Sequence, residues 1–138
     1  MTGAVHGVSE VIAALDKILA QVEAGNLRII KRSQAVVNAN IKKQFTGAHR
    51  KGTPTTSSPG SPPDVVTGTL RRSIISEAPT MSGFTARGRV YPSMIYGRIQ
   101  ELGGRGLPPR PYTAPGLAAS TSAIQAIAVE EWGKATSL

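Results

Sequence analysis

Apolar side chains in the first third of the chain recur at every third or fourth position, the spacing of an amphipathic helix. The first stripe consists of Val8, Val11, Ile12, Leu15, Ile18, Leu19 and Val22. A second stripe consists of Ile30, Val37, Ile41 and Phe45. Gly25-Asn26, between the stripes, is a helix-stop signal. The pattern predicts a helical region over 8–46, built either as two helices with a short break or as one long kinked helix.

Residues 47–69 lack any apolar periodicity. The segment holds four prolines, and its only sizeable apolar residues are Val65 and Val66. Segments of this length are usually functional or disordered, and a fully extended one would span about 75 Å. We predict an extended, flexible arm that reaches a neighbouring subunit, with a merely flexible insertion as the alternative. The arm residues expected at the contact are Arg50, Lys51, Pro54, Pro59, Pro62 and Pro63.

Residues 70–92 carry the alternation expected of a β-hairpin. Strands are predicted over 70–78 and 84–91, because a turn signal formed by Pro79, Ser82 and Gly83 separates them. In the second strand, Phe84, Ala86, Gly88 and Val90 alternate with Thr85, Arg87, Arg89 and Tyr91. This alternation predicts a sheet with one buried face and one basic face.

The last third combines helical and proline-rich segments. Residues 93–104 have helical apolar spacing closed by Gly103-Gly104, which predicts a short helix and a turn. Residues 105–116 include four prolines and are predicted as a stiff strap. On the residues alone, the strap is expected to seat Tyr112 in the core and to lead into the last helix. Its Pro115 suits the first turn of a helix.

A final helix is predicted over 117–135, because apolar residues recur there at helical spacing. These residues are Leu117, Ile124, Ile127, Ala128 and Trp132. The whole chain is therefore predicted to be a single α+β domain over 1–138. N-terminal helices precede a small antiparallel β-sheet with a long flexible loop, and a C-terminal helix closes the fold.

Composition adds a thin core and a positive charge to this picture. Only 4% of the 138 residues are aromatic, which suggests that neighbouring subunits complete the core. Sixteen Lys and Arg against eight Asp and Glu give a net charge of +8, which favours a polyanion or an acidic partner, or simply a basic surface. The chain has no cysteine and no apolar run of about 20 residues, so we predict no disulfide, thiolate site or membrane span. Its start lacks the features of a signal peptide.

Residues that carry catalysis are scarce. His6 and His49 lack the spacing of metal ligands and are predicted to be solvated, as is the pair Glu130-Glu131. Neither a nucleophile elbow nor a phosphate-binding loop occurs. We therefore predict no enzyme, cofactor or metal. The arginines Arg71, Arg72, Arg87 and Arg89 could neutralise phosphates, so a small, non-specific DNA-binding protein is the alternative from another class.

Three blocks in order are more specific: "SPGSPPDVVTGTLRRSI", "YGRIQELGG" and "LPPRPYTAPGL". With the opening "GVSEVIAALDKIL", they resemble the tail-completion and head–tail connector family of long-tailed bacteriophages. The family motifs fall on Thr67, Gly68, Leu70, Glu101, Gly103, Arg110, Pro111, Tyr112 and Pro115. Two positions depart from the family pattern, since Gly104 replaces a frequent threonine and Tyr112 replaces the commoner phenylalanine.

The resemblance implies a virion structural protein, assembled in the host cytoplasm, that forms a ring in the phage neck. DNA passes through the ring, which lies beside a connector or stopper ring and a tail terminator or the tail tube. Six copies are expected, with twelve as the alternative. A tail terminator or a portal-proximal adaptor are further readings of the same resemblance. Arg71, Arg72, Arg87 and Arg89 would then line the lumen near double-stranded DNA or meet an acidic neighbour; no membrane is implied. The resemblance also makes Arg110 an outward-pointing anchor, held by the prolines on both sides and paired with Glu101 across the turn.

Overall fold

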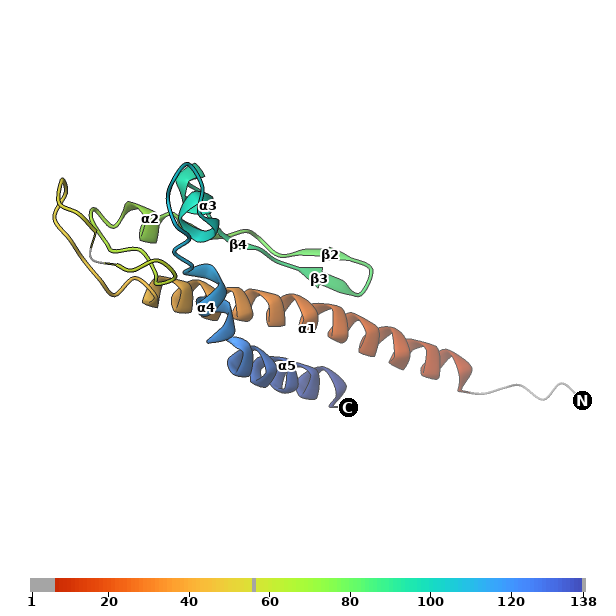
Figure 1. The fold of residues 1–138 in the computed structure, drawn as a ribbon. Coiled ribbons are helices and arrows are strands. Elements are labelled where there is room, and N and C mark those ends of the chain that lie inside the picture. Colours follow the sequence, from red (N-terminus) through yellow and green to blue (C-terminus); the bar gives the residue numbers. More distant parts are fainter. Residues whose placement is uncertain (1–6, 56, 138) are drawn as a thin grey trace, which may run out of the picture.

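The computed structural model of the chain describes residues 7–55 and 57–137. The prediction for His6 lies outside these residues. The α+β class is confirmed: a long N-terminal helix, two small antiparallel strand pairs and C-terminal helices follow one another along the chain (Figure 1). In Figure 1 the strands lie on one side of the long helix and the C-terminal helix lies on another. None of the described helices combines the length and the hydropathy needed to cross a membrane.

The N-terminal region is one helix, α1, over Val8–Lys43. Its 36 residues rise about 54 Å without a break at Gly25. Gly25 is buried, and a Cβ atom placed there would lie 3.5 Å from the Cβ atom of Ala135. Asn26 donates to the carbonyl of Phe84 at 2.9 Å and accepts from the indole of Trp132 at 2.9 Å. The apparent stop signal is therefore a packing site, and tertiary contacts override the local propensity.

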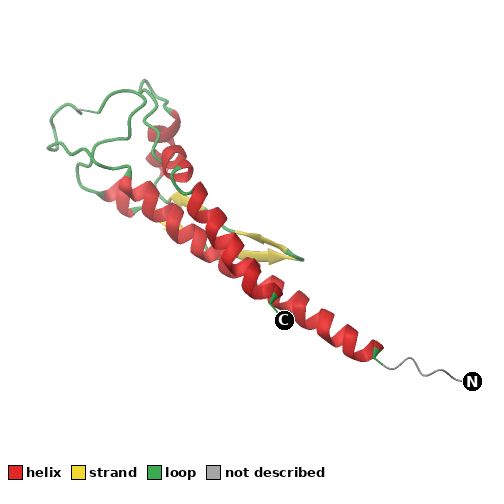
Figure 2. Ribbon diagram, turned by 90° about the horizontal axis from the view of Figure 1, so that it is seen from below, coloured by secondary structure: helices red, strands yellow, loops and turns green. Residues whose placement is uncertain are grey.

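The C-terminal helix begins earlier than predicted and is divided in two. Helix α4 covers Thr113–Ala118, and α5 covers Thr121–Thr136 and runs back along α1 (Figure 2). Ser120 lies buried at the joint, where its hydroxyl donates to the carbonyl of Gly116 at 2.8 Å and accepts from Asn40 at 2.9 Å. The strap is therefore extended only as far as the start of α4.

Glu131 on α5 is buried, so its predicted solvation is wrong. Its carboxylate accepts from Arg28 at 2.7 Å and from Arg32 at 2.6 Å, both on α1. These hydrogen bonds hold the pKa of Glu131 below its ordinary value. The neighbouring Glu130 is exposed, as predicted, and hydrogen bonds from Arg32 and Lys134 lower its pKa to about 2. This cluster ties the two long helices together.

The predicted hairpin is interrupted into two short pairs. Strand β1, Ile74–Ser76, pairs with β4, Val90–Pro92, and β2, Thr80–Ser82, pairs with β3, Thr85–Arg87. Between the pairs the backbone carbonyls of Glu77 and Arg89 accept from the side chain of Gln34 on α1, at 2.8 and 3.0 Å. The hairpin is thus fastened to α1 at the interruption.

Two details of the predicted sheet are wrong. Residues Thr69–Arg72 form one helical turn, α2, because Gly68 adopts a left-handed φ of 72° and its carbonyl accepts from the N–H of Arg72 at 2.9 Å. Phe84, expected on the buried face, is 53% exposed at the tip of the hairpin. Arg87, Arg89 and Tyr91 are exposed as predicted.

The main core is small and lies at the C-terminal end of α1. It consists of Ile41, Phe45, Ile74 and Tyr112, with Val37, Val65, Leu70 and Val90 packed around them. The predicted short helix is confirmed as α3, Ile95–Leu102. Because the core occupies one end of the molecule, the N-terminal half of α1 extends beyond it (Figures 1 and 2).

Candidate assembly site

The three sequence blocks singled out above converge around this core. Leu70 packs against the cluster that contains Tyr112. Thr67, Gly68, Leu70 and Arg110 also line one pocket of about 340 Å³, together with Gln100 and Leu107. Residues separated by more than forty positions are therefore brought into one joint, which connects the loop, α3 and α4.

Glu101 on α3 caps the N-terminus of α4. Its carboxylate accepts from the backbone N–H groups of Tyr112 at 2.8 Å, Thr113 at 2.9 Å and Ala114 at 3.1 Å. Partial burial acts to raise the pKa of Glu101, but these hydrogen bonds outweigh it and the pKa is lowered. The predicted pairing of Glu101 with Arg110 is therefore wrong, since the carboxylate is engaged by the helix instead.

We expect Glu101→Gln to lower the free energy of unfolding at pH 7 by about 1–2 kcal/mol, because a neutral amide caps α4 less well. The folded pKa of Glu101 lies below its unfolded value, so the carboxylate contributes stability above the unfolded pKa and loses it as pH falls through the folded pKa. Urea unfolding from pH 7 down to pH 3 should show the two proteins converging. An equal gap at every pH would contradict the capping role.

Gly103 shapes the turn that follows Glu101. Its φ is 76°, and a Cβ atom there would lie 3.0 Å from the carbonyl oxygen of Leu107 and 3.0 Å from the nitrogen of Pro109. Only glycine fits this left-handed, crowded position without strain. The turn returns the chain so that Arg110 donates its backbone N–H to the carbonyl of Gln100 at 2.6 Å.

Tyr112 is fully buried. Its ring centroid lies 5.0 Å from that of Phe45, and its hydroxyl donates to the carbonyl of Gly97 at 2.9 Å. Burial raises the pKa of the Tyr112 phenol above its ordinary value. Of the two predicted roles of the strap, the seating of Tyr112 in the core is the one observed. Pro115 lies in the first turn of α4, as predicted.

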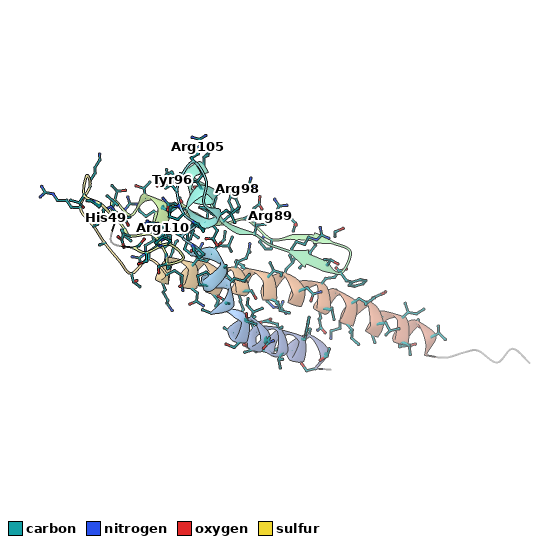
Figure 3. All side chains as sticks on the ribbon, viewed as in Figure 1. His49, Arg89, Tyr96, Arg98, Arg105 and Arg110 are labelled. Carbon is teal, nitrogen blue, oxygen red and sulfur yellow. The ribbon has the colours of Figure 1, made fainter. Side chains whose placement is uncertain are left out.

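Arg110 is half-buried and its guanidinium contacts the loop of residues 47–69, which corrects the predicted outward anchor (Figure 3). One guanidinium nitrogen donates to the hydroxyls of Thr55 at 2.9 Å and Ser57 at 2.6 Å. The carbonyl of Pro109 also accepts from the N–H of Gly60 at 2.8 Å. Pro111, between Arg110 and Tyr112, is half-buried. The proline-rich strap thus fastens the loop to the body of the subunit.

The loop itself is folded back, so the predicted extended arm is wrong. Ala48 and Val65 form a parallel bridge at its base, where the N–H of Val65 donates to the carbonyl of Gly47 at 2.7 Å. The side chain of Asp64 accepts from the N–H of Ser57 at 3.1 Å. These polar contacts, together with Val65 packed against the core and the buried Pro63, hold the loop.

The six arm residues divide into two groups. Pro63 is buried and Pro62 is half-buried against the body. The others are exposed, and contact of these with a neighbour stays a prediction: Arg50, Lys51, Pro54 and Pro59. His49, predicted to be solvated, instead lies half-buried with its Nδ1 atom 3.3 Å from a carboxylate oxygen of Asp64.

We expect Arg110→Ala to release this loop while leaving the subunit folded. Loss of the hydrogen bonds to the two hydroxyls should cost about 1 kcal/mol locally and expose the backbone after Arg50. Limited trypsin digestion followed by mass spectrometry should therefore show faster cleavage after Arg50 than in the wild-type chain. Arg105→Ala, in the exposed turn, is the matched control; equal cleavage rates in all three proteins would refute the fastening role.

The other predicted contact residues are exposed but lie in separate places. Arg71 and Arg72 belong to α2, whereas Arg87 and Arg89 belong to the hairpin region. Arg89 lies with its guanidinium nitrogen 3.9 Å from a carboxylate oxygen of Glu77. In Figure 3, Arg89, Arg98 and Arg105 follow the edge of the molecule opposite α1. The basic residues thus form a dispersed edge and not one compact patch.

Apolar hollows adjoin this edge, and sequence reasoning did not identify them. One hollow of about 540 Å³ lies between β4 and α3 and is lined by Tyr91, Pro92, Met94, Ile95, Arg98 and Leu102, among others. We call these six residues the α3 groove. A second hollow, of about 790 Å³, lies between α1, β4 and α4 and shares Val90, Tyr91 and Thr113 with the first. The sequence signal for the first hollow was the spacing of Ile95 and Leu102, which lie seven residues apart on one face of α3 and are both exposed.

Within the described part of the chain, no group of three or more His, Cys, Asp or Glu residues is placed to hold a metal ion. Comparison of the chain with protein-family models, with curated proteins and with solved structures finds no match.

Proposed function

We propose that this chain is a structural protein of a tailed-bacteriophage virion, forming a ring in the neck that joins the head-side connector to the tail. The proposal starts from the three sequence blocks and their resemblance to tail-completion and head–tail connector proteins. Their convergence in one joint supports a shared architectural role. Glu101 caps α4, Arg110 binds the loop of residues 47–69, and Tyr112 packs in the core.

The observation that carries the assembly part of the proposal is the amount of apolar surface left open. Among the described residues, sixteen large apolar side chains are exposed, whereas the buried apolar core comprises seven. Five of the sixteen follow one another along one element, α1, and an exposed apolar stripe of this kind marks an interaction site: Val8, Val11, Ile12, Leu15 and Leu19. A subunit whose neighbours cover this surface accounts for the imbalance better than a protein that acts as a monomer.

Within this function, the basic residues have an electrostatic role. The net charge of +8 and the exposed Arg71, Arg72, Arg87 and Arg89 favour a position beside double-stranded DNA in the lumen or against an acidic neighbouring ring. Six copies remain our first expectation and twelve the alternative. The tail terminator and the portal-proximal adaptor are the other neck positions that a ring of this kind could occupy.

Sedimentation velocity of the purified chain, with electron microscopy of the same sample, tests the proposal. We expect concentration-dependent assembly into closed rings with a central hole. Binding to a duplex oligonucleotide, measured in parallel at rising salt, addresses the alternative. A chain that stays monomeric and binds duplex DNA with a steep salt dependence would instead be a small DNA-binding protein.

A further inference from the structure

The N-terminal half of α1 carries an apolar stripe that the subunit does not bury. Five of its side chains, Val8, Val11, Ile12, Leu15 and Leu19, are 45–59% exposed. Figures 1 and 2 both show this part of α1 extending beyond α5 and beyond the β2–β3 hairpin. The stripe therefore has no partner among the packed elements of the described subunit.

The stripe is continuous with a helix–helix interface that the subunit already uses. The positions 8, 11, 15, 18, 22, 25 and 29 follow one another at alternating spacings of three and four, the heptad spacing of helices that pack side by side. Gly25 and Ile29, at the end of this series, are buried, and Gly25 faces Ala135 of α5. The remaining positions thus present the same kind of face for another element of the assembly to cover.

The stripe is bordered by negative charge in a chain that is otherwise strongly basic. Residues 8–24 hold three carboxylates and one amine, a net charge of −2, although the whole chain carries +8. Asp16 lies one helical turn from Ile12, and Glu23 lies one turn from Leu19, so both carboxylates flank the stripe. Lys17 lies on the opposite face of the helix.

The α3 groove has the complementary character. Ile95 is 91% exposed and Leu102 is 64% exposed, so the groove presents apolar side chains to the solvent. Arg98, one of the groove residues, is exposed, and so is Arg89, which lines the adjoining hollow (Figure 3). Glu101, a carboxylate that also lines the groove, is already bonded to backbone N–H groups of α4. An apolar helix with flanking carboxylates matches this groove in both hydrophobicity and charge.

We infer that the N-terminal half of α1 from one copy of this chain docks in the α3 groove of the next copy. The inference rests on the proposed ring. A closed ring of more than two copies requires a heterologous contact, in which two different surfaces of the subunit meet. The apolar stripe with its flanking carboxylates and the α3 groove with its exposed arginines are two such surfaces, and they lie on different parts of the molecule. Stripe-to-stripe pairing would instead be isologous and would give a dimer.

The absence of cysteine from the sequence allows a direct test. One tagged chain carries Leu15→Cys and a second chain carries Ile95→Cys; both positions are exposed, so the fold should be unaffected, which circular dichroism verifies. Mixing the two chains under mild oxidation should give a disulfide-linked heterodimer. Replacing the first variant with Lys17→Cys, on the opposite face of α1, should abolish the product.

Reversing the flanking charges tests the electrostatic part of the inference. Asp16→Arg combined with Glu23→Arg in the first chain should reduce the heterodimer yield, and Arg98→Glu in the second chain should restore it. Preferential self-linking of Leu15→Cys chains, or equal linking by Lys17→Cys, would overturn the docking inference.

Sedimentation of the unmodified chain distinguishes failure of the docking contact from failure of the proposed function. Rings without Leu15–Ile95 linkage leave the proposed function standing and reject this contact. A chain that stays monomeric at every concentration rejects both.

Discussion

Tyr112→Ala is expected to lower the free energy of unfolding by about 3–5 kcal/mol, the range for removal of a large buried aromatic side chain. Tyr112 is fully buried, packs against Phe45 and lies in the same cluster as Ile41 and Ile74. The core holds few residues, so little remains to compensate. A loss of this size approaches the whole stability of a typical domain, about 5–15 kcal/mol. Urea unfolding monitored by circular dichroism measures the effect.

Tyr112→Phe separates the packing of the ring from its hydrogen bond. The substitution keeps the contact with Phe45 but leaves the carbonyl of Gly97 without the hydroxyl donor, which should cost about 1–2 kcal/mol. The phenylalanine that is commoner at this position in the resembled family should therefore be tolerated. A variant as unstable as Tyr112→Ala would mean that the hydroxyl, and not the ring, holds the joint together.

Gly116→Ala is expected to destabilise the chain by about 3 kcal/mol, because α4 lies in direct contact with α1. A Cβ atom at Gly116 would lie 2.6 Å from the Cα atom and 2.8 Å from the backbone nitrogen of Ile41. Backbone atoms of a long helix cannot move aside cheaply, so α4 must shift outward. The displacement also pulls on Ser120, whose hydroxyl donates to the carbonyl of Gly116.

Gly133→Ala on α5 is the matched control. A Cβ atom there meets no atom within 4 Å, so the substitution should gain up to about 1 kcal/mol from helix propensity alone. The two changes are chemically identical and should move the melting temperature in opposite directions. Destabilisation by both variants, or by neither, would contradict the close packing of α4 on α1.

The arrangement of the elements followed from patterns that are local in sequence. The three-to-four spacing of apolar residues identified α1, α3 and α5, and the alternation in residues 84–91 identified a hairpin. The stop signal at Gly25-Asn26 was ambiguous because the same residues serve as a close-packing site for Ala135 and as partners of Phe84 and Trp132. Such contacts join positions 58 to 110 residues apart, and no local pattern encodes them.

The candidate site was predictable in composition but not in geometry. The blocks containing Glu101, Arg110 and Tyr112 stood out in the sequence, yet opposite charges suggested an ion pair between the first two. In the structure the Glu101 carboxylate accepts hydrogen bonds from three backbone N–H groups at the N-terminus of α4. The guanidinium of Arg110 donates to the hydroxyls of Thr55 and Ser57. Charge alone could not show that a helix terminus competes for the same carboxylate.

The conformation of the loop of residues 47–69 was not predicted from the sequence. Its proline content and lack of apolar residues predicted an extended arm, because burial of apolar side chains normally offsets the entropy of ordering a segment. Here hydrogen bonds to Arg110 and Asp64, with a short backbone bridge at the base, hold the loop instead. Polar fastening of this kind depends on partners that are distant in sequence.

The proposed neck ring can be tested by cryo-electron microscopy of the head–tail junction of a tailed phage whose genome encodes this chain. We expect a ring of identical subunits at this junction, with α1 crossing to the adjacent copy and DNA passing through the lumen. Its copy number would then be read from the symmetry of the ring. A neck whose density is fully explained by other proteins, with this chain absent from the junction, would rule out the proposed function.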